Sequence, residues 1–552
     1  NGELSFADFA TPSSTSSVVD FTAKTNGKIT LGNGSLQSGF FADGGTIYVG
    51  DGKSLTCAGA GGNNNDCSIT LSNGGIFTVG VGSTFHFDDG RFLGTGSGTI
   101  NLKTGSVTEI SDPFTLGTTR TLNAVGARLD ITSNPFVLEG SAKFEAGSSF
   151  HITGQNLNIV GGAKLSLIDS SLHGSDALTF DDSSTVELNG GNIYHQDLNF
   201  IENTKLAAVG GSTSTLHYQS PWRIEFEDNA QLTADSTGTV FIIDNWLRFS
   251  DQTSISVTDN ARLEINALVD MTTIDDEDVE AVSLTGGSTL YLDTQGSLEM
   301  DSKFTVDDSI LEVNNGTITL ANGAEMTITG SGSSAVHTNA FSTGFIELKE
   351  GSVVIVTNGS SVKIQPPVWK LSGGLFRYEG PVAISNSNET YTGPGCSVFS
   401  NSEGATEPNT VNITDGSKIT IEKQGCLQII ESDVDVVDSQ FVLHDLGRLE
   451  LSDTSLAMTG DSFFSADDST QLWLHTGSSF ALSAPVTFSN AANSSMPDHK
   501  HLLIESSSFI VNNDLTLTGA TSAHLISSDI DVTSGSLSLL GTSIMEADSS
   551  DL

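Results

Sequence analysis

The chain has 552 residues, of which 37% are hydrophobic and 58 are glycine, a composition that suits one thin continuous core better than several compact ones. The net charge of −45 reflects a shortage of bases, since 22 Lys and Arg stand against 67 Asp and Glu. The sequence contains no basic cluster and no apolar run of about 18 residues, which argues against nucleic acid as a partner and against a membrane span.

The chain opens with residues 1–40, which are less regular than the rest of the chain and are predicted to form an N-terminal cap or the first turns of a repeat. Cys57 and Cys67 then bracket the stretch CAGAGGNNNDC, whose Gly and Asn content predicts a loop. Two cysteines so close together predict a disulfide formed in an oxidising compartment; the alternative is a set of unrelated buried thiols.

Residues 41–364 repeat a short phrase in which a Gly- or Ser-containing turn precedes two apolar residues that flank one polar residue. Copies include GSTFHF, GARLDI, GSSFHI and GAKLSL. Alternation over three to five residues predicts a strand with one face inward, so His86 and His151 should point outward.

The spacing of these phrases predicts the architecture. The anchors Leu165, Val186, Leu206, Leu232 and Ile255 are 21, 20, 26 and 23 residues apart, and Leu290 and Leu311 are again 21 apart. Periods of this size indicate a repeat array. The predicted fold is therefore all-β, an elongated parallel β-solenoid with about 20–26 residues in each turn. Sandwiches or propeller blades are the alternative, but they need hairpins or longer repeats that the sequence lacks.

Carboxylates gather within TTIDDEDVEAV, at Asp275, Asp276 and Asp278. Oxygen-rich loops suit Ca²⁺, so these three residues are the candidate metal ligands, with a solvated acidic turn as the alternative. No other cofactor is expected.

Residues 365–412 carry five of the eleven prolines and are predicted to form an irregular excursion, after which the solenoid continues over 413–552. Cys396 and Cys426 are predicted to form a second disulfide that ties this excursion to the solenoid.

Six Asn-x-Ser/Thr sequons permit N-glycosylation, although chance alone predicts a similar number in so Ser- and Thr-rich a chain. They begin at Asn33, Asn315, Asn358, Asn388, Asn412 and Asn493.

The turn length and the repeated phrase resemble those of right-handed parallel β-helix proteins, a group that contains pectin-lyase-like enzymes and secreted adhesins. The resemblance implies the right-handed sense of the coil. Polygalacturonase-like members carry NTD, DD, HG and RIK elements in order. Here Asp181-Asp182 follows His173-Gly174, the reverse of that order, and the other two elements are missing.

These observations favour a non-enzymatic extracellular or cell-surface protein. The first hypothesis is a structural module of an appendage, filament or coat, glycosylated and associating with itself or with other coat proteins. An adhesin or carbohydrate-binding solenoid, with a glycan as its partner, is the second. A polysaccharide lyase or hydrolase is the third.

Overall fold

In the residues that it describes, the computed structural model contains strands and no helix, and so no helix that could cross a membrane. The described residues are 3–550 except 9–20, 37–38, 59–66, 89–90, 94–95, 112, 133–135, 154–156, 175–176, 196, 218–223, 274–279, 294, 314–315, 321–323, 330–333, 338–344, 349–352, 357–360, 365–368, 373–374, 380–381, 386–387, 393–394, 401–408, 415, 468–469 and 491–500.

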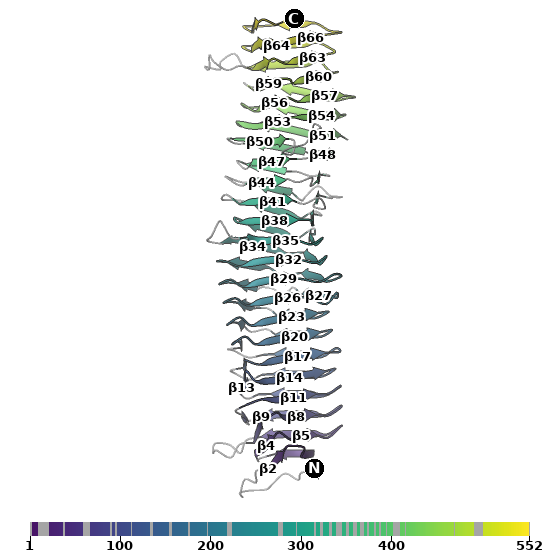
Figure 1. Cartoon of the computed structure of the whole chain (residues 1–552), viewed down its shortest axis with the longest axis vertical. Helices are drawn as coiled ribbons and strands as arrows, with labels where there is room; N and C mark the ends of the chain where they lie inside the picture. The colour runs from purple at the N-terminus through teal and green to yellow at the C-terminus, as the bar shows by residue number, and fades with distance from the viewer. Residues whose placement is uncertain are drawn as a thin grey trace. The chain divides into compact units, whose positions relative to one another are not determined.

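Successive turns of the chain contribute short parallel strands to three faces, which we call the first, second and third faces. The strand Lys28–Leu36 belongs to both the first and the second face, and the third face is interrupted between Arg91–Leu93 and Phe114–Leu116. For example, three consecutive strands at 120–138 pair in parallel with the next three at 141–159. The fold is therefore a parallel β-solenoid, as the periodicity predicted. The strands divide into two compact units, and Figure 1 shows the turns within each unit stacked in chain order.

Unit 1 comprises Asn1–Ser256 and Asn260–Leu263. Its first face contains β1 (Glu3–Asp8), β3 (Lys28–Leu36), β5 (Thr46–Val49), β8 (Gly75–Val79), β11 (Gly98–Leu102), β14 (Arg120–Val125), β17 (Ser141–Glu145), β20 (Lys164–Ile168), β23 (Thr185–Asn189), β26 (Lys205–Ala208) and β29 (Gln231–Ala234). Its second face contains β6 (Ser54–Ala58), β9 (Thr84–Asp88), β12 (Val107–Ile110), β15 (Arg128–Ile131), β18 (Ser149–Ile152), β21 (Ser171–Gly174), β24 (Asn192–His195), β27 (Thr213–Leu216) and β30 (Val240–Ile243). Its third face contains β2 (Phe21–Lys24), β4 (Gly39–Asp43), β7 (Ser68–Ser72), β10 (Arg91–Leu93), β13 (Phe114–Leu116), β16 (Phe136–Leu138), β19 (Leu157–Ile159), β22 (Leu178–Phe180), β25 (Leu198–Phe200), β28 (Ile224–Phe226) and β31 (Leu247–Ser250).

Unit 2 comprises Val257–Asp259 and Glu264–Leu552, and the division runs through β32 (Ser254–Val257) and β33 (Arg262–Ile265). Its first face contains β35 (Glu280–Leu284), β38 (Lys303–Asp307), β41 (Glu325–Thr329), β44 (Val353–Val356), β47 (Leu375–Glu379), β50 (Gly395–Ser400), β53 (Gly425–Ile430), β56 (Arg448–Ser452), β59 (Gln471–His475), β62 (Leu502–Glu505), β65 (Ser522–Ile526) and β68 (Ile544–Asp548). Its second face contains β36 (Thr289–Leu292), β39 (Ile310–Val313), β42 (Ser334–His337), β45 (Ser361–Ile364), β48 (Val382–Ser385), β51 (Asn409–Thr414), β54 (Ser432–Val437), β57 (Ser455–Thr459), β60 (Ser479–Leu482), β63 (Ser508–Val511) and β66 (Asp529–Val532). Its third face contains β34 (Leu268–Thr273), β37 (Ser297–Met300), β40 (Thr317–Leu320), β43 (Phe345–Leu348), β46 (Trp369–Ser372), β49 (Asn388–Thr392), β52 (Lys418–Glu422), β55 (Gln440–Leu443), β58 (Phe463–Ala466), β61 (Val486–Asn490), β64 (Leu515–Gly519) and β67 (Leu537–Leu539).

The predicted anchors lie directly opposite one another on neighbouring turns. On the first face, Leu165 pairs with Val186, Val186 with Leu206, and Leu206 with Leu232. On the second face of unit 2, Leu290 pairs with Leu311. Turn length varies more than the predicted 20–26 residues, from 18 between Lys28 and Thr46 to 30 between Cys396 and Cys426.

Inward side chains stack on like side chains of the next turn and form the core. On the third face of unit 1, Phe180, Phe200, Phe226 and Phe249 are fully buried. Their ring centroids are 4.5, 4.7 and 4.6 Å apart and their planes are within 9° of parallel. The 4.7–4.9 Å spacing of parallel strands sets this distance, so the sheet itself aligns the rings.

Serine and threonine hydroxyls line buried corners between the first and second faces. In unit 2 the backbone N–H of Thr454 donates to Ser478 Oγ at 3.4 Å, that of Ser478 to Ser507 Oγ at 3.3 Å, and that of Ser507 to Ser528 Oγ at 3.2 Å. Each hydroxyl thus satisfies a buried donor of the turn before it, which explains why a Ser-rich chain builds this fold.

The described parts of 365–412, the segment predicted to form an irregular excursion, contain strands. Strands β46 to β51 occupy this segment and pair in register with strands of the turns before and after. The five prolines fall outside the bounds of these strands and outside the described residues.

Candidate functional site: a groove and a ring ladder on the second face

The outward residues in the middle of the second-face strands form a continuous row in unit 1. Their inward neighbours are buried, as Phe85 and Phe87 are on either side of His86. The register then places one outward residue of each turn beside that of the next. This outer row consists of Thr56, His86, Glu109, Asp130, His151, His173, Tyr194 and His217.

The last four members of the outer row form a ladder of stacked rings. The ring centroids of His151 and His173 are 4.5 Å apart, those of His173 and Tyr194 are 4.8 Å apart, and those of Tyr194 and His217 are 4.0 Å apart. The interplanar angles are 7° or less. A hydrogen bond of 2.8 Å between His173 Nε2 and Ser171 Oγ fixes the ring orientation inside the ladder.

Burial favours the neutral form of the imidazoles in the ladder. Burial lowers the pKa of His151, His173 and His217. The neighbouring Arg128 lowers the pKa of His151 further, and His151 does the same to His173. Neutral rings can stack without the repulsion that two imidazolium ions would experience at 4.5 Å.

A hollow of about 630 Å³ lies over the first members of the outer row and ends at His151. A second row of polar side chains, two residues further along each strand or at its corner, forms its other wall. The hollow is lined by Thr56, His86, Phe87, Asp88, Glu109, Ser111, Arg128, Asp130, Thr132, His151 and Thr153. We call it the second-face groove.

Two of the three carboxylates that line the groove lie against a basic side chain. His86 Nδ1 lies 2.7 Å from Glu109 Oε2, and Arg128 Nε lies 2.8 Å from Asp130 Oδ1. The hydroxyl of Ser111 donates to Asp88 at 3.2 Å. The groove therefore offers many hydrogen-bonding atoms, and three carboxylates line it against one permanently charged base, Arg128.

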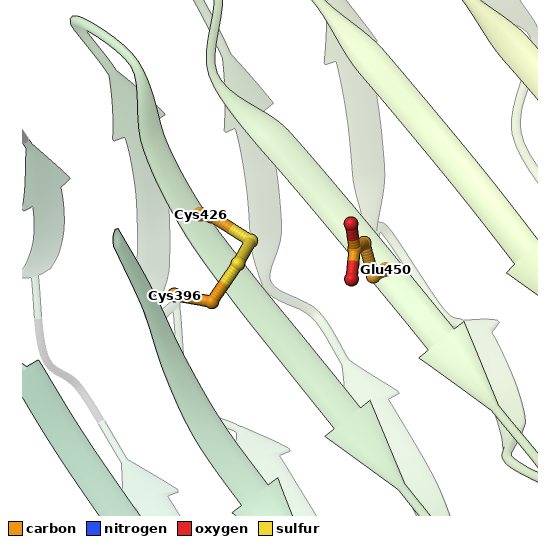
Figure 2. A group of neighbouring side chains, drawn as sticks. All are labelled: Cys396, Cys426 and Glu450. Atoms are coloured by element: carbon orange, nitrogen blue, oxygen red, sulfur yellow. A yellow bond between two sulfur atoms is a disulfide. The ribbon is translucent and has the colours of Figure 1, made fainter. Parts of the chain in front are cut away.

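Both predicted disulfides are present. Cys57 in β6 bonds to Cys67 just before β7, which staples one corner within a turn. Cys396 in β50 bonds to Cys426 in β53, which staples two successive turns. Figure 2 shows this bond between the neighbouring strands, with Glu450 on the next strand.

The guanidinium of Arg448 lies against the second disulfide. A guanidinium N–H of Arg448 donates to Cys396 Sγ at 3.3 Å, and its Nε lies 2.9 Å from Glu450 Oε1. The guanidinium also stacks 4.7 Å from the centre of the Trp473 ring. The two sulfur atoms are bonded to each other, so Cys396 and Cys426 form a structural cross-link and not a metal site.

The structure describes only some of the predicted site residues. Asn33 and Asn412 are exposed on strands, and Asn388 lies in β49. Asn315, Asn358 and Asn493 lie outside the described residues, as do the candidate metal ligands Asp275, Asp276 and Asp278.

The structure brings together another acidic group, formed by Asp181, Asp182 and Glu202 at a corner of unit 1. The charge of Asp181 raises the pKa of the exposed Glu202 carboxyl. The geometry of these carboxylates therefore makes them repel one another.

Sequence reasoning placed His86 and His151 on the outside but missed the row that they belong to. The signal was available, because His151, His173 and Tyr194 are spaced by one turn length each. No family model matches the chain, and a search of curated proteins found no match.

Proposed function

We propose that the chain is an extracellular structural module of a surface appendage, filament or coat. The observation that carries the proposal is the stacking of short parallel strands into turns, each hydrogen-bonded to the turns on either side, throughout the described parts of both units. Proteins of this kind gain stability from nearest-neighbour contacts, so they can be long without a large globular core.

Two disulfides support the extracellular part of the proposal, because disulfides persist in oxidising compartments. The exposed sequons Asn33 and Asn412 are accessible to a glycosyltransferase. Treatment of the natively secreted protein with an N-glycosidase should lower its mass; an unchanged mass would remove glycosylation from the proposal.

The proposed partners are further copies of the chain or other coat proteins. Negative-stain electron microscopy of the source material, with sedimentation velocity of the purified chain, tests this assembly. We expect filaments or sheets in the micrographs and species larger than a monomer in the sedimentation profile. Monomers that stay separate at every concentration, and source material without ordered assemblies, would refute it.

We assign the chain no catalytic activity, because the sequence lacks the ordered motif set of the polysaccharide-cleaving solenoids that it resembles. Incubation with acidic and neutral polysaccharides, with and without Ca²⁺, tests this assignment. Release of reducing or unsaturated ends above a heat-treated control would overturn it.

A further inference from the structure

We propose that Cys396 is a site of thiol–disulfide exchange, at which a small thiol from outside the chain opens the bond to Cys426. All four cysteines of the chain are in disulfides, so the attacking thiolate must belong to another molecule. The proposal concerns one bond of unit 2 and does not depend on assembly of the chain, so it can succeed or fail separately from the structural role.

Exposure distinguishes Cys396 from the other three cysteines. Cys396 is partly exposed on the first face, whereas Cys426 is only 3% exposed. Cys57 and Cys67, which form the other disulfide, are both fully buried. Exchange needs direct access of a thiolate to one sulfur atom. A thiolate from solvent therefore meets the second disulfide before the first, and it meets the Cys396 end of that bond.

The register places this bond on the outer side of the first face. Cys396 and Cys426 lie directly opposite each other on β50 and β53, and Figure 2 shows the bond between the two strands. The residues that follow them, Ser397 and Leu427, are buried, so the two cysteines lie on the outward side of the sheet. Cys426 is buried although it lies outward, which means that another side chain covers it.

Arg448 is the side chain that covers Cys426. It lies directly opposite Cys426 on the next strand, β56, and its guanidinium reaches past Cys426 to donate to Cys396 Sγ at 3.3 Å. Its contacts with Glu450, at 2.9 Å, and with the Trp473 ring, at 4.7 Å, hold it there. A thiolate attacks a disulfide in line with the S–S bond, so attack on Cys426 would come from the side where Arg448 lies. This geometry directs attack to Cys396.

The exchange then proceeds in two balanced steps. In the first, an external thiolate RS⁻ forms a bond to Cys396 Sγ, the bond between Cys396 and Cys426 breaks, and its electron pair leaves on Cys426 Sγ as a thiolate. In the second, another RS⁻ attacks the sulfur of R in the mixed disulfide and releases RSSR and the thiolate of Cys396. The protein disulfide is reduced, and two external thiols are oxidised to RSSR.

Two charged groups act on the departing thiolate in opposite directions. The guanidinium of Arg448, opposite Cys426, stabilises a negative charge on sulfur, as a neighbouring arginine does for thiolates in general. An oxygen of Glu450 lies within 4.8 Å of both sulfur atoms and opposes that charge. A better stabilised thiolate leaves faster. Removing the guanidinium should therefore slow exchange, and removing the carboxylate charge should speed it.

The site of attack can be mapped on the folded full-length chain. The protein is incubated with 2-mercaptoethanol, quenched at intervals with excess iodoacetamide, and digested for mass spectrometry of the cysteine peptides. We expect a mixed disulfide on Cys396 together with alkylated Cys426, while Cys57 and Cys67 stay bonded to each other. Equal rates of opening for the two disulfides would mean that exchange follows unfolding of the chain. That result, or a mixed disulfide mainly on Cys426, would overturn the proposal.

Variants test the action of the two charges. Arg448→Met removes the positive charge but keeps a side chain long enough to cover Cys426, and it should slow opening of the bond roughly threefold or more. Glu450→Gln should speed opening. The matched control is Arg128→Met in unit 1, where the arginine likewise lies 2.8 Å from an acid two residues later, Asp130, and it should leave the rate unchanged. Circular dichroism checks that each variant folds.

The first two variants also distinguish charge from shielding. Loss of cover alone would speed opening in both variants. Loss of charge slows opening in Arg448→Met and speeds it in Glu450→Gln. Faster opening in both variants, or an unchanged rate in both, would overturn the mechanism in which Cys426 leaves as a thiolate beside Arg448.

Discussion

Replacing Phe200 by Ala tests whether the phenylalanine ladder holds the third face of unit 1 together. Phe200 is fully buried and stacks on Phe180 at 4.5 Å and on Phe226 at 4.7 Å. Truncating a buried phenylalanine side chain to alanine costs about 3–5 kcal/mol. Because the substitution removes ring contacts on both sides, we expect the local free energy of opening to fall by about 5 kcal/mol.

Phe200→Leu separates stacking from burial. Leucine keeps most of the apolar surface but loses two ring contacts, each worth about 0.5–1.5 kcal/mol, so we expect a loss of about 1–3 kcal/mol. Thr179→Ala, an outward substitution on the neighbouring strand β22, is the control and should change the free energy by no more than about 0.5 kcal/mol.

Amide hydrogen exchange resolved by peptide is the appropriate assay, because repeat arrays need not unfold in a single step. The loss of protection from exchange should be largest in β22, β25 and β28. It should fade by β13, four turns before β25, since only neighbouring turns are in contact. Exchange that is unchanged at β25, or raised equally throughout unit 1, would refute this reasoning.

Three further predictions concern other features of the molecule. Replacing Cys396 and Cys426 by Ser should cost about 3–4 kcal/mol, because the bond closes a loop with a sequence separation of 30, and hydrogen exchange should place the loss in β50 and β53. Gly75→Ala should lower the thermal midpoint markedly or prevent folding, because a Cβ there would overlap the backbone carbonyl of Ala42 on the previous turn; a midpoint within a few degrees of wild type would be inconsistent with that packing. Acid should loosen the ring ladder: the folded protein lowers the pKa of His173 below its unfolded value of about 6.5, so the contribution of His173 to the free energy of unfolding is constant above about pH 7 and falls as the pH drops from 6.5 through the folded pKa. Protection of the β18 to β24 amides from hydrogen exchange, measured between pH 7.5 and 5, should fall with pH, and His173→Phe should make this fall smaller. If protection falls equally steeply with pH in the two proteins, His173 in the ladder is not its cause.

The fold could be predicted because the repeated phrase, the clearest pattern in the sequence, also sets which residues of neighbouring turns pair. The phrase with two apolar residues around a polar one occurs on the first and second faces, and its anchors Leu165, Val186 and Leu206 pair as their spacing indicated. The third face was harder to recognise. Its strands are often three residues long, as at Phe114–Leu116, which is too short to show an alternating pattern.

The strands within 365–412 were missed for a related reason. Proline removes a ladder donor, so a proline-rich segment was interpreted as a break in the solenoid. Turns made of three short strands have three corners each, and Pro381 and Pro394 fall between strands that pair normally. Counting prolines cannot reveal this without the position of each corner.

The site was beyond prediction because it is a property of register between turns. His86, Glu109 and Asp130 are 23 and 21 residues apart, and no local motif connects them. They become neighbours only when Phe85, Thr108 and Leu129 are aligned on the inward side of the same sheet. A row of this kind can be found in a sequence once the inward anchors of each turn are fixed.

The same register explains how an acidic chain tolerates stacked strands. Outward residues of successive turns lie about 4.8 Å apart, where like charges repel. Several bases pair with an acid of the neighbouring turn, as Lys164 does with Glu187 and His86 with Glu109. With 22 bases and 67 acids, most acids lack a Lys or Arg of their own, and some lie opposite another acid, as Asp270 does opposite Glu299. The extra residues of longer turns lie at the corners between strands, and the buried inward residues keep the outward rows of successive turns aligned. The outward rows can therefore change sequence without disturbing the core, which makes them the part of this fold best suited to acquire a binding surface.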